Sequence, residues 1–201
     1  MTRLFLARHA ETTWHAENRY AGTSDIDLTP AGRDQARRLA AWAADARLDA
    51  VWTSPLRRAQ ASAAPAAEAA GAPLFTDPEL AEVHFGIAEG HRLDELPPAV
   101  VEAFRADPVA GAFPGAEDFG RAAARGVAAL RRIAHRHEDG RVLVVAHSTL
   151  LRLTLCELLG IAVARYRTVF PQLVNCAPSE LDLTGEVAGL RSLNLPLPPG
   201  P

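Results

Sequence analysis

The sequence contains no lysine, so all 21 basic residues among its 201 are arginines. This absence excludes chemistry that depends on a lysine amine, such as a Schiff base, a pyridoxal anchor or the lysine of a P-loop. Cysteine is nearly as scarce, because only Cys156 and Cys176 are present and they form no C-x-x-C pair. A disulfide framework and a cysteine-rich zinc site are therefore excluded, and we expect a reducing, cytoplasmic setting.

Long apolar runs and a strong net charge are also missing. The apolar run near the amino terminus covers only residues 4–7, which is too short for the core of a signal peptide. No stretch of 18 apolar residues occurs, so we expect no membrane span. The formal net charge of −3 gives no general attraction to nucleic acid or to an anionic membrane, and we expect neither as a partner.

What the sequence does contain is an alternation of short apolar runs with helical stretches. Hydrophobic residues make up 48% of the chain, which suffices for one compact domain over residues 1–201. Buried strands are predicted at 4–7, 49–53 and 141–146, and helices over 29–47, 54–70, 117–137 and 148–159. Thr29–Pro30 and Ser54–Pro55 are both typical of helix starts. The alternation predicts a three-layer α/β/α sandwich with a mostly parallel sheet.

Two stretches depart from this alternation. Residues 91–116 contain a short helical segment at 99–106, followed by several prolines and glycines, which indicates a small inserted cap. Residues 166–195 alternate in polarity and predict antiparallel strands at the edge of the sheet.

Two of the predicted strands run directly into a histidine. His9 follows the first strand through Arg8, and His147 follows the last buried strand. Ligands of open α/β sheets bind beyond the carboxyl ends of the strands, so both imidazoles should lie at the functional edge. The pair Arg57–Arg58 follows the remaining strand at that edge.

Imidazoles and guanidiniums without a metal-type cluster suit a phosphoryl group. A guanidinium matches the phosphate oxygens with two parallel hydrogen bonds, and an imidazole can attack phosphorus to form a phosphohistidine. The helix that opens at Ser148 could add backbone N–H donors.

The motifs that carry this chemistry follow one another in a fixed order. They are Leu-Ala-Arg-His-Ala-Glu-Thr at 6–12, the loop and helix start at 22–36, Ser-Pro-Leu-Arg-Arg-Ala at 54–59, the glutamate-bearing segment at 80–90, and the strand and helix at 142–152. This series resembles the histidine phosphatase superfamily, whose members include phosphoglycerate mutases and many small-molecule phosphatases. Since the motifs extend through most of the chain, the resemblance is specific.

The resemblance implies a role for each of five residues. His9 is the nucleophile that becomes phosphorylated, and Arg8, Arg58 and His147 form the phosphate pocket. Glu82 gives a proton to the leaving oxygen, after which water hydrolyses the phosphohistidine. The chemistry requires a hydrogen-bond acceptor at the second ring nitrogen of His9. It also requires that Glu82 hold a proton near neutral pH, which implies partial burial or a nearby carboxylate.

Other positions depart from the pattern of the family or add to it. His15 stands where many members have Asn, and we expect it to contact a phosphate oxygen. Gly22 and Ser148 complete the predicted substrate-binding residues. Ala10 replaces the usual Gly after the first histidine, and Ala88 stands where phosphatase-like members often carry Trp.

Several assignments keep an alternative. Arg57 competes with Arg58 for the pocket, and Glu79 and Glu89 compete with Glu82. His84 is as consistent with substrate contact as with a polar loop position. The arginines of the helix at 117–137 are expected on a solvated face, and the alternative is that Arg121 or Arg125 reaches a second anion of the substrate.

The sequence thus predicts a metal-independent phosphomonoesterase that acts on a small phosphorylated metabolite and needs no cofactor, with a homodimer as the expected assembly if it has one. One alternative is a phosphoglycerate mutase, against which Val83 and the short chain count. Another is a protein phosphohistidine phosphatase, against which the predicted cap counts. A non-catalytic phosphate-binding module is the alternative from a different class, and the presence of every residue that the mechanism needs counts against it.

Overall fold

A single mixed sheet of six strands lies at the centre of the computed structural model, which describes residues 1–197. The strands are β1 (Thr2–Arg8), β2 (Ala50–Thr53), β3 (Leu74–Thr76), β4 (Arg141–Ala146), β5 (Ser179–Thr184) and β6 (Val187–Ser192). Their order is β3-β2-β4-β1-β5-β6. The neighbours from β3 to β1 pair in parallel, and β5 and β6 add an antiparallel edge. The predicted mostly parallel sheet is confirmed.

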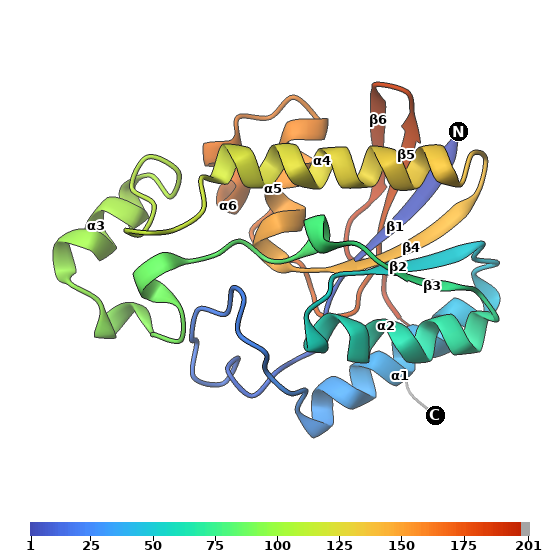
Figure 1. The fold of residues 1–201 in the computed structure, drawn as a ribbon, viewed down its shortest axis with the longest axis horizontal. Coiled ribbons are helices and arrows are strands. Elements are labelled where there is room, and N and C mark those ends of the chain that lie inside the picture. The colour runs from blue at the N-terminus through green and yellow to red at the C-terminus, as the bar shows by residue number, and fades with distance from the viewer. Residues whose placement is uncertain (198–201) are drawn as a thin grey trace.

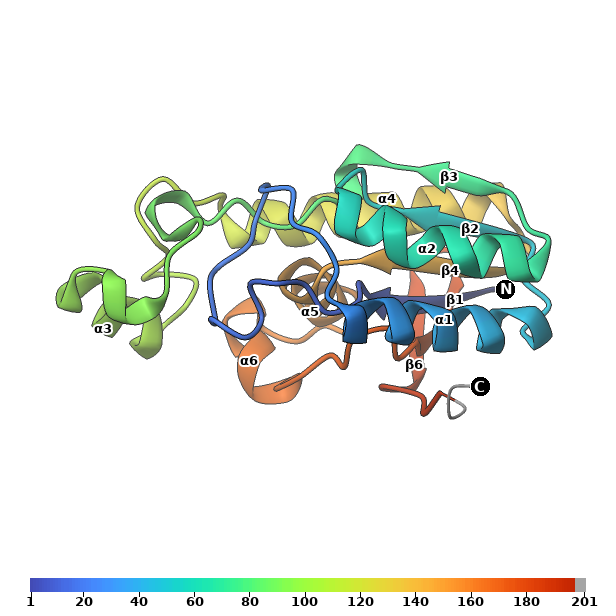
Figure 2. The ribbon, with the colours of Figure 1, turned by 90° about the horizontal axis from the view of Figure 1, so that it is seen from below.

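Helices cover both faces of this sheet (Figures 1 and 2). They are α1 (Pro30–Asp45), α2 (Arg57–Ala70), α3 (Pro98–Ala106), α4 (Phe119–Arg136), α5 (Ser148–Leu158) and α6 (Tyr166–Val169). Short 3-10 helices occupy Pro78–Leu80, Gly86–Ala88, Leu93–Glu95 and Val163–Arg165. Successive strand residues point to opposite faces, so Leu4 packs with the core under α4 and α5, while Phe5 packs with the core under α1 and α2. The predicted three-layer sandwich is confirmed.

The two predicted helix starts behave differently. Thr29 caps α1 as expected, because its side chain accepts a hydrogen bond from the Gly32 amide. Ser54 does not cap α2, which begins only at Arg57 after Leu56. The prediction of a helix from residue 54 was therefore wrong by three residues, because the Ser54 hydroxyl bonds to the His147 ring instead.

The prediction of strands across 166–195 was also only partly right. Residues 166–169 form α6, and pairing begins only at Ser179. Pro171 and Pro178 have no N–H to donate to a ladder, so the chain between them runs as a loop. That loop returns to the end of β1, where the Cys176 amide donates to the Arg8 carbonyl at 2.8 Å.

The segment 91–116 lies at one end of the molecule, where α3 projects away from the sheet (Figures 1 and 2). Its ends are joined by a bridge between Phe85 and Ala116. At Gly86, which has a φ of 57°, an added Cβ would meet the Pro114 carbonyl oxygen at 2.1 Å. Only glycine fits this crossing, so the base of the segment is fixed even though its body leaves the sheet. Among residues 1–197, no helix combines the length and the apolar character needed to cross a bilayer.

Candidate active site

The residues that the sequence singled out meet at the carboxyl ends of β1 and β4. The rings of His9 and His147 have their centroids 5.1 Å apart, and those of His9 and His15 are 5.8 Å apart. Arg58 reaches the same point from α2, with its Nε 3.3 Å from His9 Nε2. An open cleft of about 1120 Å³ begins here, and its lining includes Arg8, His9, His15, Glu82 and Ser148.

His9 is held as a neutral imidazole with a defined tautomer. Its Nδ1 lies 2.7 Å from the Ala10 carbonyl oxygen, which can only accept, so Nδ1 carries the proton. The lone pair is then on Nε2, where the Arg58 Nε–H donates to it. Burial, followed by the charges of Arg8 and Arg58, holds the pKa of His9 well below 6.5. The acceptor that the chemistry requires at the second nitrogen is the Ala10 carbonyl.

Arg58 is almost fully buried and is anchored by a loop. Its guanidinium donates to the carbonyls of Ser24 and Gly22 at 2.7 Å each, and to that of Ala21 at 3.2 Å. The carboxylate of Glu89 holds this loop by accepting from the amides of Gly22 and Ser24 and from the Ser24 hydroxyl. Glu89, one alternative to Glu82, therefore orders the loop. The other alternative for the pocket, Arg57, is exposed and pairs with Asp27.

Gly22 does not line the cleft; it contributes its backbone instead. An added Cβ there would lie 2.5 Å from the Glu89 carboxylate and 2.6 Å from the Val83 carbonyl oxygen. The loop can approach Glu89 so closely only because this position has no side chain. Through its carbonyl, Gly22 orients Arg58.

His15 and Arg8 are in direct contact. Nη2 of Arg8 can only donate, so the Nε2 of His15 at 2.7 Å accepts from it, and the proton of the neutral ring is on Nδ1. Nδ1 lies 2.8 Å from the Thr12 hydroxyl, which accepts this proton. Burial and then the charge of Arg8 lower the pKa of His15 to about 4. His15 therefore helps to orient the Arg8 guanidinium at the site.

At this site, two further buried donors have no hydrogen-bond partner within residues 1–197. They are Nε of Arg8 and Nδ1 of His147. His147 Nε2 lies 2.7 Å from the Ser54 hydroxyl, which also accepts from the Leu56 amide, so the hydroxyl proton is directed to Nε2 and the ring proton to Nδ1. Burial lowers the pKa of Arg8 to about 10, and burial and then the charge of Arg58 hold that of His147 well below 6.5. The site therefore has a surplus of donors, which suits an oxyanion.

Glu82 lies at the amino terminus of α5, on the loop that follows the 3-10 helix Pro78–Leu80. Its side chain is buried, and one oxygen accepts from the amides of Val83 and Leu150 at 2.9 Å each. The other oxygen accepts from the Thr149 amide at 3.0 Å. The N–H donors predicted at the opening of this helix are thus used to orient the carboxylate.

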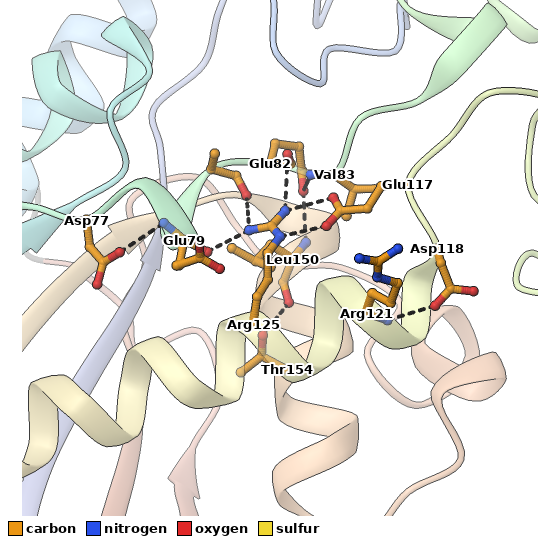
Figure 3. Close-up of polar contacts among 11 residues, drawn as sticks. Asp77, Glu79, Glu82, Val83, Glu117, Asp118, Arg121, Arg125, Leu150 and Thr154 are labelled. Atoms are coloured by element: carbon orange, nitrogen blue, oxygen red, sulfur yellow. Dashed lines mark hydrogen bonds and ion pairs between the residues drawn. The ribbon is translucent and has the colours of Figure 1, made fainter.

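Arg125 braces the loop that carries Glu82 (Figure 3). From α4 its Nη1 donates to the carbonyls of Glu79 and Ala81 at 2.6 and 2.8 Å. Two parallel contacts of 2.7 and 2.9 Å join the same guanidinium to the Glu117 carboxylate. Arg125 is therefore an internal support, and the idea that it reaches a substrate anion does not fit its contacts. Arg121 is exposed and does not line the cleft either.

The sequence reasoning missed several supporting residues. Asn175 donates from Nδ2 to the His9 carbonyl at 2.6 Å, and nothing in the local pattern indicates that this loop returns to β1. The roles of Glu117 and Arg125 likewise depend on contacts between distant segments. His84 is exposed, lies outside the cleft lining and accepts from the Gly86 amide. Within residues 1–197, no group of three or more His, Cys, Asp or Glu side chains is arranged to hold a metal ion.

The neutral histidines make the stability of the fold sensitive to acid. His9, His15 and His147 all have folded pKa values below the unfolded value of about 6.5, so their contribution is complete above that pH. As the pH falls below it, the unfolded chain binds more protons, and the free energy of unfolding decreases by up to about 1.4 kcal/mol per pH unit for each histidine. Urea unfolding between pH 7 and pH 5 measures this loss. In His15→Asn, the free energy of unfolding should depend less steeply on pH, by about one proton. His135→Asn, which replaces an exposed histidine, is the control and should keep the wild-type slope. Equal slopes in wild type and His15→Asn would contradict the prediction.

The brace predicts a large effect of Arg125→Ala. This change leaves the mostly buried Glu117 carboxylate and two loop carbonyls without their donor, and we expect it to lower the free energy of unfolding by about 2–4 kcal/mol. The matched control on the same helix is Arg131→Ala, whose partner Glu186 is exposed, and it should cost less than about 1 kcal/mol. Equal losses in the two variants, measured by chemical denaturation, would show that Arg125 is an ordinary surface residue.

Comparison with known proteins agrees with this arrangement. Residues 4–196 match the sequence profile of the histidine phosphatase superfamily (branch 1). The chain is 31% identical to phosphoserine phosphatase 1 of Hydrogenobacter thermophilus over 169 residues, covering 83% of this chain and 80% of that protein. It is 33% identical to the probable phosphoglycerate mutase GpmB of an Enterobacter species over 186 residues, covering 90% and 85%. Among solved structures, YhfR of Bacillus stearothermophilus superposes with a TM-score of 0.90 at 27% identity, over 97% of this chain and 98% of that one. The chain belongs to the histidine phosphatase superfamily and is an enzyme of its phosphoric monoester hydrolase class.

Proposed function

We propose that this enzyme hydrolyses the phosphate ester of a small metabolite through a phosphohistidine intermediate on His9, with no metal or other cofactor. The observation that carries the proposal is the protonation state of His9. Its Nδ1–H is fixed on the Ala10 carbonyl, so the electron pair is on Nε2, where it accepts a long hydrogen bond of 3.3 Å from the Arg58 Nε–H that a phosphoryl oxygen would take over. A nucleophile and a positive group are thus placed where a phosphoryl group needs both.

In the first step, the phosphoryl oxygens lie against Arg8, Arg58 and the Nδ1–H of His147. Nε2 of His9 attacks phosphorus, a new N–P bond forms, and the bond from phosphorus to the ester oxygen breaks. The leaving oxygen takes a proton from Glu82. The donors are in place before the reaction, so they stabilise the charge that develops on the equatorial oxygens without rearranging.

In the second step, water attacks the phosphohistidine. Glu82, now a carboxylate, accepts a proton from this water, the N–P bond breaks, and inorganic phosphate leaves with His9 neutral again. The three amides that donate to Glu82 hold its side chain in place for both proton transfers.

Access to His9 bears on the alternatives. Arg92, Leu93, Asp94 and Arg105 of the segment 91–116 line the cleft, which supports the interpretation of this segment as a small cap within a single domain. A segment that lines the way to the nucleophile favours a small substrate over a protein. Mutase-type transfer would pass the same phosphoryl group to a second hydroxyl; the open cleft, which admits water to His9, favours hydrolysis.

The cytoplasmic location and the homodimer remain predictions from the sequence.

His9→Ala tests the proposal directly. We expect hydrolysis of p-nitrophenyl phosphate to fall by at least about 1000-fold, because the nucleophile is lost while the phosphate pocket remains. Wild-type enzyme quenched during turnover of a radiolabelled substrate should carry a label that is lost in acid and stable in alkali, as expected for phosphohistidine.

The control variant is His135→Ala, which removes an exposed histidine of α4 that pairs only with Glu138. It should retain wild-type rates. Turnover by His9→Ala near the wild-type rate, or a label that survives acid, would refute the phosphohistidine. Release of a phosphorylated product instead of inorganic phosphate would indicate the mutase.

Glu82→Gln separates the acid from the rest of the pocket. The hydrolysis of glycerol 3-phosphate, whose alkoxide leaves poorly, should fall by about 100-fold or more, since general acid catalysis contributes about that much. The burst of p-nitrophenolate in a single turnover should fall far less, because that leaving group needs no proton. Glu79→Gln is the control, since Glu79 was the competing carboxylate. An equal loss for both leaving groups would exclude Glu82 as the proton donor.

A further inference from the structure

The outer part of the cleft holds arginines of two kinds. Arg19 forms ion pairs with Glu17 and Glu95, and Arg92 pairs with Asp94 and Glu95. The second kind consists of Arg105, Arg152 and Arg167. None of these three forms an ion pair with a carboxylate among residues 1–197. The acidic residues of the cleft are thus already in use, and three positive charges have no counter-charge.

These three arginines come from three different elements and line the same cleft as Tyr20. Arg105 is in the last turn of α3, Arg152 is in α5, and Arg167 is in α6. The Tyr20 ring packs edge-on against Phe104, the neighbour of Arg105 in α3, with ring centroids 6.0 Å apart. Burial raises the pKa of Tyr20, and the charges of Arg167, Arg152 and Arg105 act against that rise.

Two of the guanidiniums are oriented by their surroundings. Arg152 donates to the carbonyls of Phe170 and Pro171 at 3.3 and 3.4 Å, and its Cζ lies 4.9 Å from the centre of the Tyr166 ring. The Cζ of Arg167 lies 5.1 Å from the centre of the Phe104 ring. These contacts fix positions without neutralising charge. Burial lowers the pKa of Arg152, and the charge of Arg167 adds to that lowering, so the two groups repel each other.

Arg105 and Arg167 are exposed and Arg152 is half-buried, so water hydrates them in the free enzyme, and an anion in the cleft can replace that water. A carboxylate or phosphate accepts hydrogen bonds from several guanidiniums at once and removes their repulsion. Arg152 is also close enough to Arg8 for its charge to lower the pKa of that residue, after the larger effect of burial. The unpaired arginines therefore border the phosphate pocket, and both regions open into the same cleft.

We propose that Arg105, Arg152 and Arg167 form a second anion subsite, and that the preferred substrate is a phosphomonoester that carries a further carboxylate or phosphate group. This inference rests on the proposed function, because it takes the first phosphate to be the one that reacts at His9. The scissile phosphate lies among Arg8, Arg58 and His147, and the second anion lies between α3 and α6. The cleft of about 1120 Å³ has room for both groups.

A matched pair of substrates tests this subsite. 3-Phosphoglycerate and glycerol 3-phosphate differ mainly in a carboxylate that replaces a hydroxymethyl group. We expect wild-type enzyme to release inorganic phosphate from the carboxylate with a kcat/KM at least about tenfold higher, the scale of one charge-assisted hydrogen bond. Fructose 1,6-bisphosphate against fructose 6-phosphate is the second arm, and the arm with the larger ratio identifies whether the second anion is a carboxylate or a phosphate.

In the variant Arg105→Gln/Arg167→Gln, the larger of the two kcat/KM ratios should fall to about threefold or less. Because each ratio is taken within one variant, a general loss of folding or of phosphate binding cancels. The control Arg37→Gln/Arg121→Gln removes the same charge from exposed positions outside the cleft and should keep the wild-type ratio.

Three results would overturn the subsite: no preference for the second anion in the wild type in either arm, a preference that survives in Arg105→Gln/Arg167→Gln, or an equal loss in the control. The proposed function fails by a different measurement, which is unchanged hydrolysis of p-nitrophenyl phosphate in His9→Ala. The two ideas can therefore be rejected separately.

Discussion

The concentration of positive and potentially positive groups around His9 is the constraint on which the rest of the structure depends. Two guanidiniums and three imidazoles lie together, and burial keeps the imidazoles neutral by holding the pKa of each below 6.5. Arg58 stays charged in this place because it donates to three carbonyls of one loop. The site thus carries little compensating negative charge except Glu82, and it is prepared for an anionic ligand.

Most of the surrounding structure holds these charges in position. Glu89 orders the loop whose carbonyls receive Arg58, and Gly22 allows the close approach. On the opposite side, the first amides of α5 hold the carboxylate of Glu82, while Arg125 holds the backbone behind it. Each support comes from a segment far away in the sequence, so the geometry of the site depends on the complete packing of the domain. For this reason the amides at the start of α5, which the sequence suggested for substrate binding, donate to the Glu82 carboxylate instead.

The fold followed from the sequence to the extent that the signals were local. The apolar runs into His9 and His147 predicted strands β1 and β4, and the cap at Thr29 predicted α1, since each depends on neighbouring residues. Ser54 misled the prediction because a side chain across the sheet, His147, competes for the same hydroxyl. For the site, strand ends and family motifs placed His9, Arg58 and Glu82 correctly at one edge. They gave no information on Asn175, Glu117 or the three unpaired arginines, since these acquire their surroundings only when separate helices and loops meet.

The bridge that closes the segment 91–116 has a consequence for how this protein can diversify. The groups that meet at His9 stand on β1, β4 and the elements packed on them. Arg105 stands on the segment 91–116, which is held at its base by the crossing of Phe85 and Ala116 and by contacts with the loop at 19–20. Glu89 must stay, because it orders the loop that holds Arg58, but residues 97–112 make no hydrogen bond with that loop or with Glu82. Their length and charge can change while the groups that meet at His9 keep their supports. Selection can therefore alter what the outer part of the cleft admits by rewriting this outlying segment, while the residues around His9 are kept.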